Sequence, residues 1–426
     1  MKILIISHNP ITSYESMGKT MRQLFCAFDK EELCQFYIYP TLPDIDCCAS
    51  YFRVTDKDVL KSYARFGKVK GHTVDKSLIS EKNDTMFENR KDEGLYRNRK
   101  NKKSGRMLLR EFMWKFSRWY NVPLRQWLEE QRPEAIFVAP GTGVFLYRIA
   151  LRIAKERRIP IVTYLCDDYY FVRKQRSLLH KLHMSWLRRN TRKLLSQSSH
   201  IVCICTELKE RFAEEFKVPA TTIMTGTSRP IEKHALERSA PKSITYMGNI
   251  RCNRYISLAQ IGSALEELNR KLGKDYTLKI YTGENDGEIL QTLQNSSAVE
   301  LCGFVTGKAF EDAFREAQLL LHTEAFDEKN IDLVKDSVST KIADCLGSGI
   351  CLVAYGPENV ASMRHLLKNG CALAATQEED LPELLENAFL DSAAREKTVE
   401  NALQTAAAFH DSQRNSRCLH KLMESV

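Results

Sequence analysis

The chain has 426 residues, of which 43% are hydrophobic and 27% charged, and its formal net charge is +9. This length predicts two domains, and the composition is that of an ordinary soluble globular protein. Thirteen cysteines in so long a chain do not form a disulfide framework, and the close pairs Cys47–Cys48 and Cys203/Cys205 lack zinc-ligand spacing. We therefore expect reduced thiols in a reducing cytosol.

The N-terminus, MKILIISHNP, has a short apolar run behind a single lysine. A secretory signal has a longer apolar core and a small-residue cleavage site, so we interpret this run as a first core strand. No window approaches 18 consecutive apolar residues, which excludes a transmembrane helix. We expect a cytoplasmic protein.

In the first half of the chain, short apolar runs alternate with amphipathic segments of ten to sixteen residues. Predicted strands lie at 2–7, 35–39, 133–140, 159–166 and 200–205, and predicted helices at 18–28, 56–66, 143–158 and 180–195. Such alternation is typical of a parallel sheet with helices on both faces. The helical segment from 107 carries an aromatic stripe, Phe112, Phe116 and Trp119, which we expect in the core.

Between 219 and 241 the periodicity fails, and Gly226, Pro230 and Pro241 interrupt the segment. We expect an N-terminal domain over 1–218, a linker over 219–241, a second domain over 242–400 and a C-terminal helix within 401–426 that packs back on the first domain. In the second domain, strands are predicted at 243–248, 276–283, 298–304, 318–324, 350–355 and 371–375, and helices at 256–272, 287–294, 308–317, 359–369 and 381–389. The fold class is α/β, with two tandem doubly wound, Rossmann-like domains facing across a cleft.

The positive charge is concentrated in residues 61–110, which hold 15 Lys or Arg and six Asp or Glu. The densest part is RNRKNKKSGR at 97–106. One interpretation is a solvated loop, and the other is a patch for an anionic membrane surface or a phosphorylated substrate. Nucleic acid is not expected as a partner, because only Tyr96 lies beside the run for stacking and no binding module follows.

The segment DSVSTKIADCLGSGICLVAY, from Asp336 to Tyr355, predicts a short helix that opens on hydroxyl groups and a lysine and leads into a buried strand. The N-terminus of such a helix suits an anion. Asp336 and Asp344 bracket it, with seven residues between them. A cation at a helix N-terminus opposes the helix dipole, so Lys341 at this place favours an anionic ligand.

Several familiar sites are missing. Neither predicted domain has G-x-G-x-x-G after its first strand, and the GTG at 141–143 lacks a third glycine and an acidic partner. A Walker A loop and a G-x-S-x-G elbow are also absent from the sequence. These absences disfavour a dehydrogenase, an NTPase and an esterase.

Three motifs resemble the retaining GT-B glycosyltransferases of family 4 and its relatives, which include many polysaccharide-biosynthesis enzymes. YMGNIRCNR resembles the first strand and glycine turn of the second domain, with Arg254 six residues after Gly248. LLLHTEAFD, with Glu324, resembles the loop that approaches the donor. The segment from Asp336 resembles the family's nucleotide-sugar segment, in which two glutamates with seven residues between them contact the sugar and the ribose. Here both acids are aspartates.

The resemblance implies a role for each matching residue. Arg254, Lys341 and Asp336 would be the catalytic group, with Arg254 and Lys341 stabilising the leaving diphosphate. The donor would also contact Gly248, Asn249, Glu324, Ser339, Thr340 and Asp344, with Asp344 at the ribose. No cofactor is implied, and a metal is not expected, because fixed cations and helix N-termini can neutralise the diphosphate.

The acceptor side is predicted in the first domain. His8 and Gly18 bracket the loop after the first strand, and Asp168 and Tyr169 follow the strand at 159–166. These four are candidates for acceptor binding or proton acceptance. His8 as a structural loop residue and Asp168 as a structural cap remain open alternatives.

The sequence therefore predicts a hexosyltransferase that uses a nucleotide sugar and a glycan or lipid-linked acceptor in surface-glycan biosynthesis. Peripheral contact with the inner membrane face is expected through 97–106. Two alternatives remain: a catalytically silent GT-B subunit that binds nucleotide or acts as a scaffold, and a nucleotide-sugar epimerase on the same fold.

Overall fold

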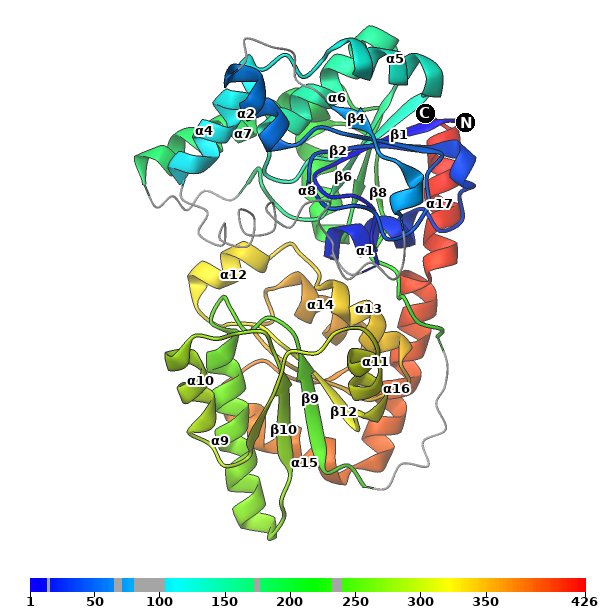
Figure 1. Ribbon diagram of the computed structural model, residues 1–426. Helices are drawn as coiled ribbons and strands as arrows, with labels where there is room; N and C mark the ends of the chain where they lie inside the picture. The colour runs from blue at the N-terminus through cyan, green and yellow to red at the C-terminus, as the bar shows by residue number, and fades with distance from the viewer. Residues whose placement is uncertain (14–15, 65–70, 80–103, 172–176, 232–239) are drawn as a thin grey trace. The chain divides into compact units, whose positions relative to one another are not determined.

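The structure is a computed structural model that describes residues 1–13, 16–64, 71–79, 104–171, 177–231 and 240–426. It divides into two compact units, one formed by Met1–Thr225 with Ser412–Val426 and the other by Gly226–Asp411 (Figure 1). Each unit is a parallel-sheet α/β domain. All thirteen cysteines lie in the described residues, and all are free thiols.

In the described part of unit 1, eight strands form one sheet in the order β4-β3-β2-β1-β5-β6-β7-β8. Neighbouring strands are parallel except β3 and β4, which pair antiparallel at one edge. The strands are β1 (Ile3–Ser7), β2 (Leu33–Tyr37), β3 (Ser50–Arg53), β4 (His72–Thr73), β5 (Ala135–Ala139), β6 (Ile161–Leu165), β7 (His200–Cys203) and β8 (Ala220–Thr222).

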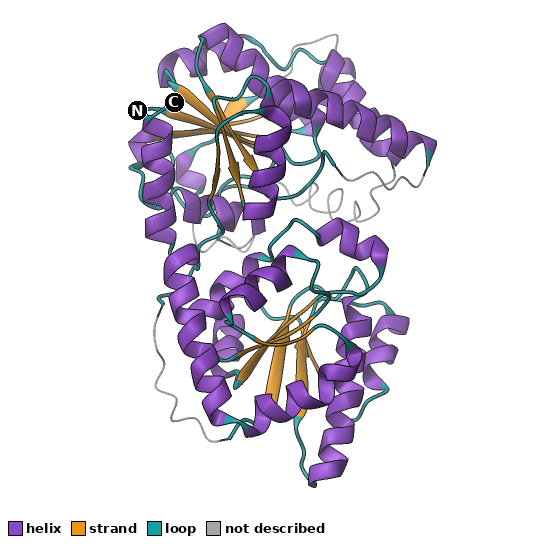
Figure 2. Cartoon of the chain, turned by 180° about the vertical axis from the view of Figure 1, so that it is seen from behind, coloured by secondary structure: helices purple, strands orange, loops and turns teal. Residues whose placement is uncertain are grey.

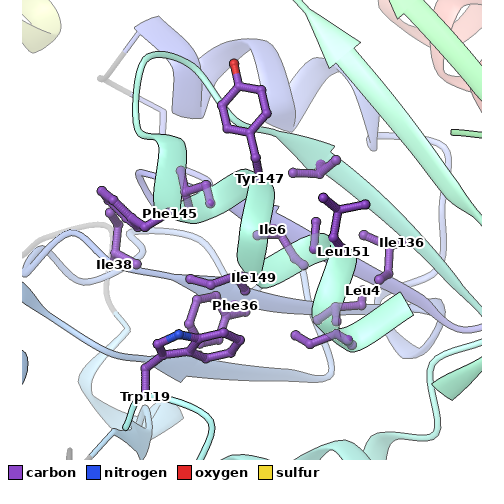
Figure 3. Close-up of a cluster of buried hydrophobic side chains, with 14 of the residues drawn as sticks. Leu4, Ile6, Phe36, Ile38, Trp119, Ile136, Phe145, Tyr147, Ile149 and Leu151 are labelled. Carbon is purple, nitrogen blue, oxygen red and sulfur yellow. The ribbon is translucent and has the colours of Figure 1, made fainter. Parts of the chain in front are cut away.

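Helices cover both faces of this sheet (Figure 2). They are α1 (Ser16–Leu24), α2 (Asp56–Ala64), α4 (Ser104–Phe116), α5 (Val122–Gln131), α6 (Val144–Arg157), α7 (Leu178–Leu195) and α8 (Thr206–Phe216). On one face, Ile6 of β1 and Ile136 of β5 are fully buried together with Ile149 of α6 (Figure 3). Because the central strands are buried on both faces, they read as continuous apolar runs, and this is why the sequence predicts them well.

In the described part of unit 2, six parallel strands have the order β11-β10-β9-β12-β13-β14. The strands are β9 (Ser243–Met247), β10 (Thr277–Tyr281), β11 (Val299–Gly303), β12 (Leu319–Thr323), β13 (Leu352–Tyr355) and β14 (Leu373–Ala375). The helices are α9 (Arg254–Leu272), α10 (Gly287–Gln294), α11 (Gly307–Glu316), α12 (Glu328–Val334), α13 (Thr340–Gly347), α14 (Ala361–Asn369), α15 (Leu381–Leu390) and α16 (Ser392–Thr405). In chain order, this sheet starts at its centre and reverses direction between β9 and β12.

The end of the chain returns to unit 1. After α16 and a short π-helical segment, Ala406–His410, helix α17 (Ser412–Glu424) packs against α1. Leu419 and Met423 are buried in the unit 1 core, and the Ser416 hydroxyl accepts a hydrogen bond from the Ala27 N–H at 2.9 Å.

Some expectations differ from the structure. Phe112 and Phe116 are 47% and 64% exposed, so their prediction as core residues is wrong, whereas Trp119 is buried. The helix turns Trp114 toward the core instead. Strand β8 occupies 220–222, inside the expected linker, and β3 and β4 lie where the sequence showed little order. Of the basic run at 97–106, residues 97–103 lie outside the described residues.

Replacing Leu419 by alanine should destabilise unit 1, because it opens a cavity where α17 enters the core. The expected loss is about 2–5 kcal/mol of unfolding free energy. Thermal and urea unfolding followed by circular dichroism measure it. Lys421→Ala, on the exposed side of the same helix, is the control and should behave as the parent protein. Equal stability of both variants would show that α17 is not part of the folded core.

Candidate active site

The candidate site lies where the unit 2 sheet reverses its strand order. Gly248 follows β9 and Glu324 follows β12, and these two strands are hydrogen-bonded neighbours. In open parallel sheets, ligands bind outside the carboxyl ends of the strands at this switch point. Helix α9 starts just after β9, and the N-terminus of α13 follows β12 through α12. Two helix N-termini therefore belong to the same edge of the sheet.

The turn after β9 is tightly fixed. Cys252 and Asn253 have left-handed backbone angles, with φ of 58° and 59°. The Arg251 Nε donates to Glu284 at 2.8 Å, and the Asn253 side chain donates to Asp327 at 3.0 Å. Asn249, one of the predicted donor contacts, uses its side-chain oxygen to accept the Arg251 N–H at 2.7 Å. This network places Arg254 as the first residue of α9.

Arg254 is paired with Glu324. Its Nε and Nη2 lie 2.8 and 2.7 Å from the same carboxylate oxygen of Glu324. Glu324 is buried, although a residue at the end of a strand could be solvated. Burial raises the pKa of Glu324, and the positive charge of Arg254 opposes that rise. The carboxylate thus offsets the unfavourable position of a cation at the N-terminus of α9.

Lys341 lies in the first turn of α13, and its ammonium fits the space left by Gly248. A β-carbon at Gly248 would lie 1.5 Å from the Lys341 Nζ, and the φ of +151° also favours glycine there. The Nζ lies 5.5 Å from the centre of the Tyr246 ring. Among the described residues, it has no hydrogen-bond acceptor and no carboxylate within ion-pair distance, although the Glu324 carboxylate is near enough to raise its pKa. The side chain keeps some exposed surface. Desolvation of the ammonium by the surrounding protein, followed by the charge of Arg254, lowers the pKa of Lys341 to about 8.

His322 belongs to this cluster, and the sequence analysis missed it. It is buried on β12, and its Nε2 lies 3.6 Å from Glu324 without a hydrogen-bond partner in the described part of the chain. Burial, followed by the charges of Arg254 and Lys341, lowers its pKa to about 3, so the ring is neutral. The available signal was its position: a polar residue two places before Glu324 on a strand that ends at the site.

Ser339 and Thr340 form the start of α13. Ser339 is the N-cap residue, but its side chain makes no capping hydrogen bond, and its N–H donates to the Ser362 hydroxyl at 3.1 Å. Thr340 is the first residue of the helix. The first N–H groups of a helix lack partners within it, so this end offers donors beside the Lys341 ammonium.

Both bracketing aspartates are buried. Asp344 Oδ1 accepts hydrogen bonds from the Thr227 hydroxyl at 3.1 Å, the Ser228 N–H at 2.8 Å and the Ser228 hydroxyl at 2.9 Å. Asp336 lies 3.8 Å from Arg364 Nη2. Asp344 therefore anchors the segment at the start of unit 2, and contact of either aspartate with a donor stays a prediction.

The acceptor-side candidates lie in unit 1. His8 follows β1, its Nδ1 lies 2.6 Å from the Asn9 side-chain oxygen, and its Nε2 lies 3.1 Å from Arg110. Gly18 lies in α1, where a β-carbon would come within 2.2 Å of the Thr12 hydroxyl. The close approach at Gly18 is thus made by the chain's own loop.

Asp168 and Tyr169 follow β6, and both side chains have structural contacts. Asp168 Oδ1 accepts the N–H groups of Tyr170 and Phe171 at 2.9 and 2.7 Å, as a turn-capping carboxylate does. The Tyr169 hydroxyl donates to Asp167 at 2.5 Å. Their role toward an acceptor remains a prediction.

The structure thus brings together Gly248, Arg254, Glu324 and Lys341, with His322 added. Among the described residues, no group of three or more His, Cys, Asp or Glu side chains is arranged to hold a metal ion. The chemical capacity of the cluster is anion binding: one paired guanidinium, one unpaired ammonium and helix N–H groups.

Comparisons with known proteins agree with the fold. A sequence model of Glycosyltransferase Family 4 matches residues 71–226. No curated protein matches the sequence. HepE of Anabaena, solved with UDP and glucose, is 11% identical with a TM-score of 0.62 over 100% of both chains. The UDP-forming α,α-trehalose-phosphate synthase of Burkholderia xenovorans, solved with glucose-6-phosphate, is 11% identical with a TM-score of 0.60 over 99% of this chain and 100% of that one.

Sucrose-phosphate synthase of Thermosynechococcus elongatus is 8% identical, with a TM-score of 0.61 over 100% of this chain and 99% of that chain. At these identities the structural likeness establishes the fold alone. The chain has the GT-B fold, and it resembles the family 4 glycosyltransferases in sequence over 71–226. The comparisons support a glycosyltransferase.

The Lys341 ammonium should titrate near pH 8, and a bound diphosphate should raise that pKa because an anion favours the charged form. Proton–carbon NMR of the labelled lysine side chains measures both values, with Lys341→Arg used to assign the signal. Since the pKa in the folded protein is lowered, the contribution of Lys341 to stability should increase as pH rises from about 8 toward the unfolded value of about 10.4. A Lys341 signal with an ordinary lysine pKa would show that neither burial nor Arg254 disfavours its charge.

Asp344→Ala should lower the unfolding free energy by about 1–3 kcal/mol, because Thr227 and Ser228 lose a charged acceptor. Asp344→Asn retains an oxygen acceptor and should cost less. Thermal unfolding without ligand compares the two variants, with Asp275→Ala as an exposed control. If Asp344→Ala unfolds like the parent protein, the carboxylate is not an anchor.

Proposed function

We propose that the protein transfers a hexosyl unit from a nucleotide sugar to a glycan or lipid-linked acceptor, with retention of configuration, in surface-glycan biosynthesis. One observation carries the proposal. The Lys341 ammonium lies at a helix N-terminus against Gly248, at the switch point of the sheet, without a carboxylate in direct contact among the described residues. A diphosphate is the ligand that such a group fits best.

In the proposed reaction, the diphosphate leaves with growing negative charge. Lys341, the Thr340 N–H group at the start of α13 and Arg254 would stabilise that charge, and Arg254 would exchange part of its contact with Glu324 for a phosphate oxygen. Because Glu324 holds the guanidinium in place beforehand, little reorganisation is needed when the donor binds. We propose no metal, since these fixed charges would serve in its place.

The structural neighbours support a nucleotide-sugar donor, because HepE of Anabaena was solved with UDP and with UDP-glucose. The hexosyl unit, the glycan or lipid-linked acceptor and peripheral contact with the inner membrane face are also proposed. Every helix in the part of the chain that the structure describes is too short or too polar to span a bilayer.

Asp344 favours a second candidate, a catalytically silent protein that binds nucleotide or acts as a scaffold. Its carboxylate is occupied by Thr227 and Ser228, whereas the resemblance expects it at the ribose. Such a protein would still bind a diphosphate at Lys341 but would not turn over.

A panel of UDP-, GDP- and ADP-sugars tests the reaction, with release of nucleoside diphosphate as the readout and thermal shift as the binding readout. Arg254→Lys should lower kcat/KM by about 10²-fold, since it removes a bidentate donor from the developing charge. Arg270→Lys, at the far end of α9, is the matched control. EDTA should leave the rate unchanged.

The two readouts separate the candidates. Turnover that depends on Arg254 supports the transferase, whereas a thermal shift without turnover supports the silent binding protein. Neither turnover nor a shift with any sugar nucleotide would rule out both.

A further inference from the structure

Helices α4 and α7 of unit 1 expose an unusual amount of apolar surface. Six large side chains on these helices are between 47% and 72% exposed, and we call them the α4–α7 ridge: Leu109, Phe112, Phe116, Leu178, Leu179 and Leu182. Scattered single apolar residues are normal on a protein surface, but a contiguous group marks an interaction site.

The ridge is contiguous because the two helices pack side by side (Figure 1). Leu179 lies 3.8 Å from the β-carbon position of Gly105, and the Phe112 ring lies 5.5 Å from that of Trp186. Phe112 and Phe116 stack with ring centres 6.3 Å apart. On α7, Leu178 and Leu182 are four residues apart and so share one face of the helix.

The exposed charges carried by α4 and α7 are all positive, and one of them, Arg192, pairs with Glu215 of α8 at 3.5 Å. Within α4 and α7, both covered by the described residues, the sole Asp or Glu is Glu111, which is buried and accepts the Val144 N–H at 2.7 Å. The exposed cations are Arg106, Lys115, Lys181, Arg189, Arg192 and Lys193. Among the described residues, Lys181, Arg189 and Lys193 have no acidic partner.

A basic hollow adjoins the ridge. It has a volume of about 650 Å³ and is lined by Lys115, Arg189, Arg192 and Lys193 together with Trp186. The Lys115 ammonium lies 5.2 Å from the Phe116 ring and 5.7 Å from the Trp186 ring, so the apolar and cationic surfaces meet at these residues. A tryptophan between an apolar surface and a charged one is typical of residues at the level of lipid head groups.

We propose that the α4–α7 ridge inserts into the surface of an anionic phospholipid bilayer, with lipid phosphates in the basic hollow. The apolar side chains enter the acyl boundary, and the cations around them face the head groups. The inference rests on the proposed function, which includes a membrane contact. It assigns that contact to the α4–α7 ridge and its cations, of which only Arg106 belongs to the 97–106 run. Vesicle binding needs no sugar nucleotide, so its failure and failure of the transfer reaction are separate results.

Co-sedimentation with vesicles of equal phosphatidylglycerol and phosphatidylcholine tests the proposal, with pure phosphatidylcholine vesicles for comparison. Binding should require phosphatidylglycerol and weaken at high salt. Phe116→Ser with Leu182→Ser should weaken it by about tenfold or more. Arg189→Glu with Lys193→Glu should weaken it by roughly fivefold for each positive charge removed, and by more where the new charge is repelled.

Matched controls lie in unit 2. Phe304→Ser with Leu390→Ser removes equally exposed apolar groups, and Lys274→Glu with Lys397→Glu makes the same charge change. Both control double variants should bind the vesicles more strongly than the corresponding ridge double variants. Circular dichroism and thermal unfolding of all four double variants verify the fold.

Trp186 supplies a local readout, because the other three tryptophans, Trp114, Trp119 and Trp127, are buried. Vesicles should shift its fluorescence to shorter wavelength, brominated lipid should quench it, and Trp186→Phe should abolish both effects. Equal binding to phosphatidylcholine, or ridge variants that bind like the parent, would overturn the proposal. The proposal would also be overturned if light scattering showed a dimer that the ridge substitutions convert to a monomer. The ridge would then bind a second copy of the chain.

Discussion

Two cations at the N-termini of two helices dominate the electrostatics of the candidate site. Each opposes its helix dipole by about 0.3–1 kcal/mol. Burial and then the charge of Arg254 lower the pKa of Lys341. Glu324 offsets one of the two cations through its two short contacts with Arg254. The other, Lys341, has no carboxylate in direct contact among the described residues, and Glu324 acts on it only from a distance. In such a site, a positive charge is already in position before an anion binds. This arrangement is electrostatic preorganisation.

The architecture of both units was predictable because it follows from periodicity. Buried parallel strands are continuous apolar runs, and the helices between them show an apolar stripe at helical spacing. Strands β3, β4 and β8 were missed because they are short and contain polar residues, whereas the equally short β14 lies within the apolar run CALAA. The position of Arg254 was predicted through the family resemblance, which expects a basic residue six places after the glycine of the turn. His322 was missed because a histidine within LLLHT looks like any other residue of a buried strand.

The aromatic residues of α4 show what periodicity leaves undecided. It identifies a stripe, but it does not say whether the stripe faces the core or an outside partner. In α4, the core side instead presents Trp114, whose indole N–H donates to the buried Asp56 at 2.8 Å, and Glu111. Burial raises the pKa of Glu111 to about 7 even though its carboxylate accepts the first N–H of α6. Polar groups with tertiary partners thus occupy the inward face, and the phenylalanines are left on the outward one.

The contacts of residue 344 explain why an aspartate, and not a glutamate, stands at this position. The resemblance expects a glutamate reaching a ribose from this helix. The structure instead directs Asp344 Oδ1 at the backbone and hydroxyl of Ser228, with donors between 2.8 and 3.1 Å away. A side chain one methylene longer would carry its oxygens past these donors or force the segment at 227–228 outward. The shorter acid therefore suits an anchoring role, and it leaves Lys341, Arg254 and the N-terminus of α13 as the groups proposed to bind an anionic ligand. Diphosphate recognition can thus be retained at this site even if the ribose contact is not.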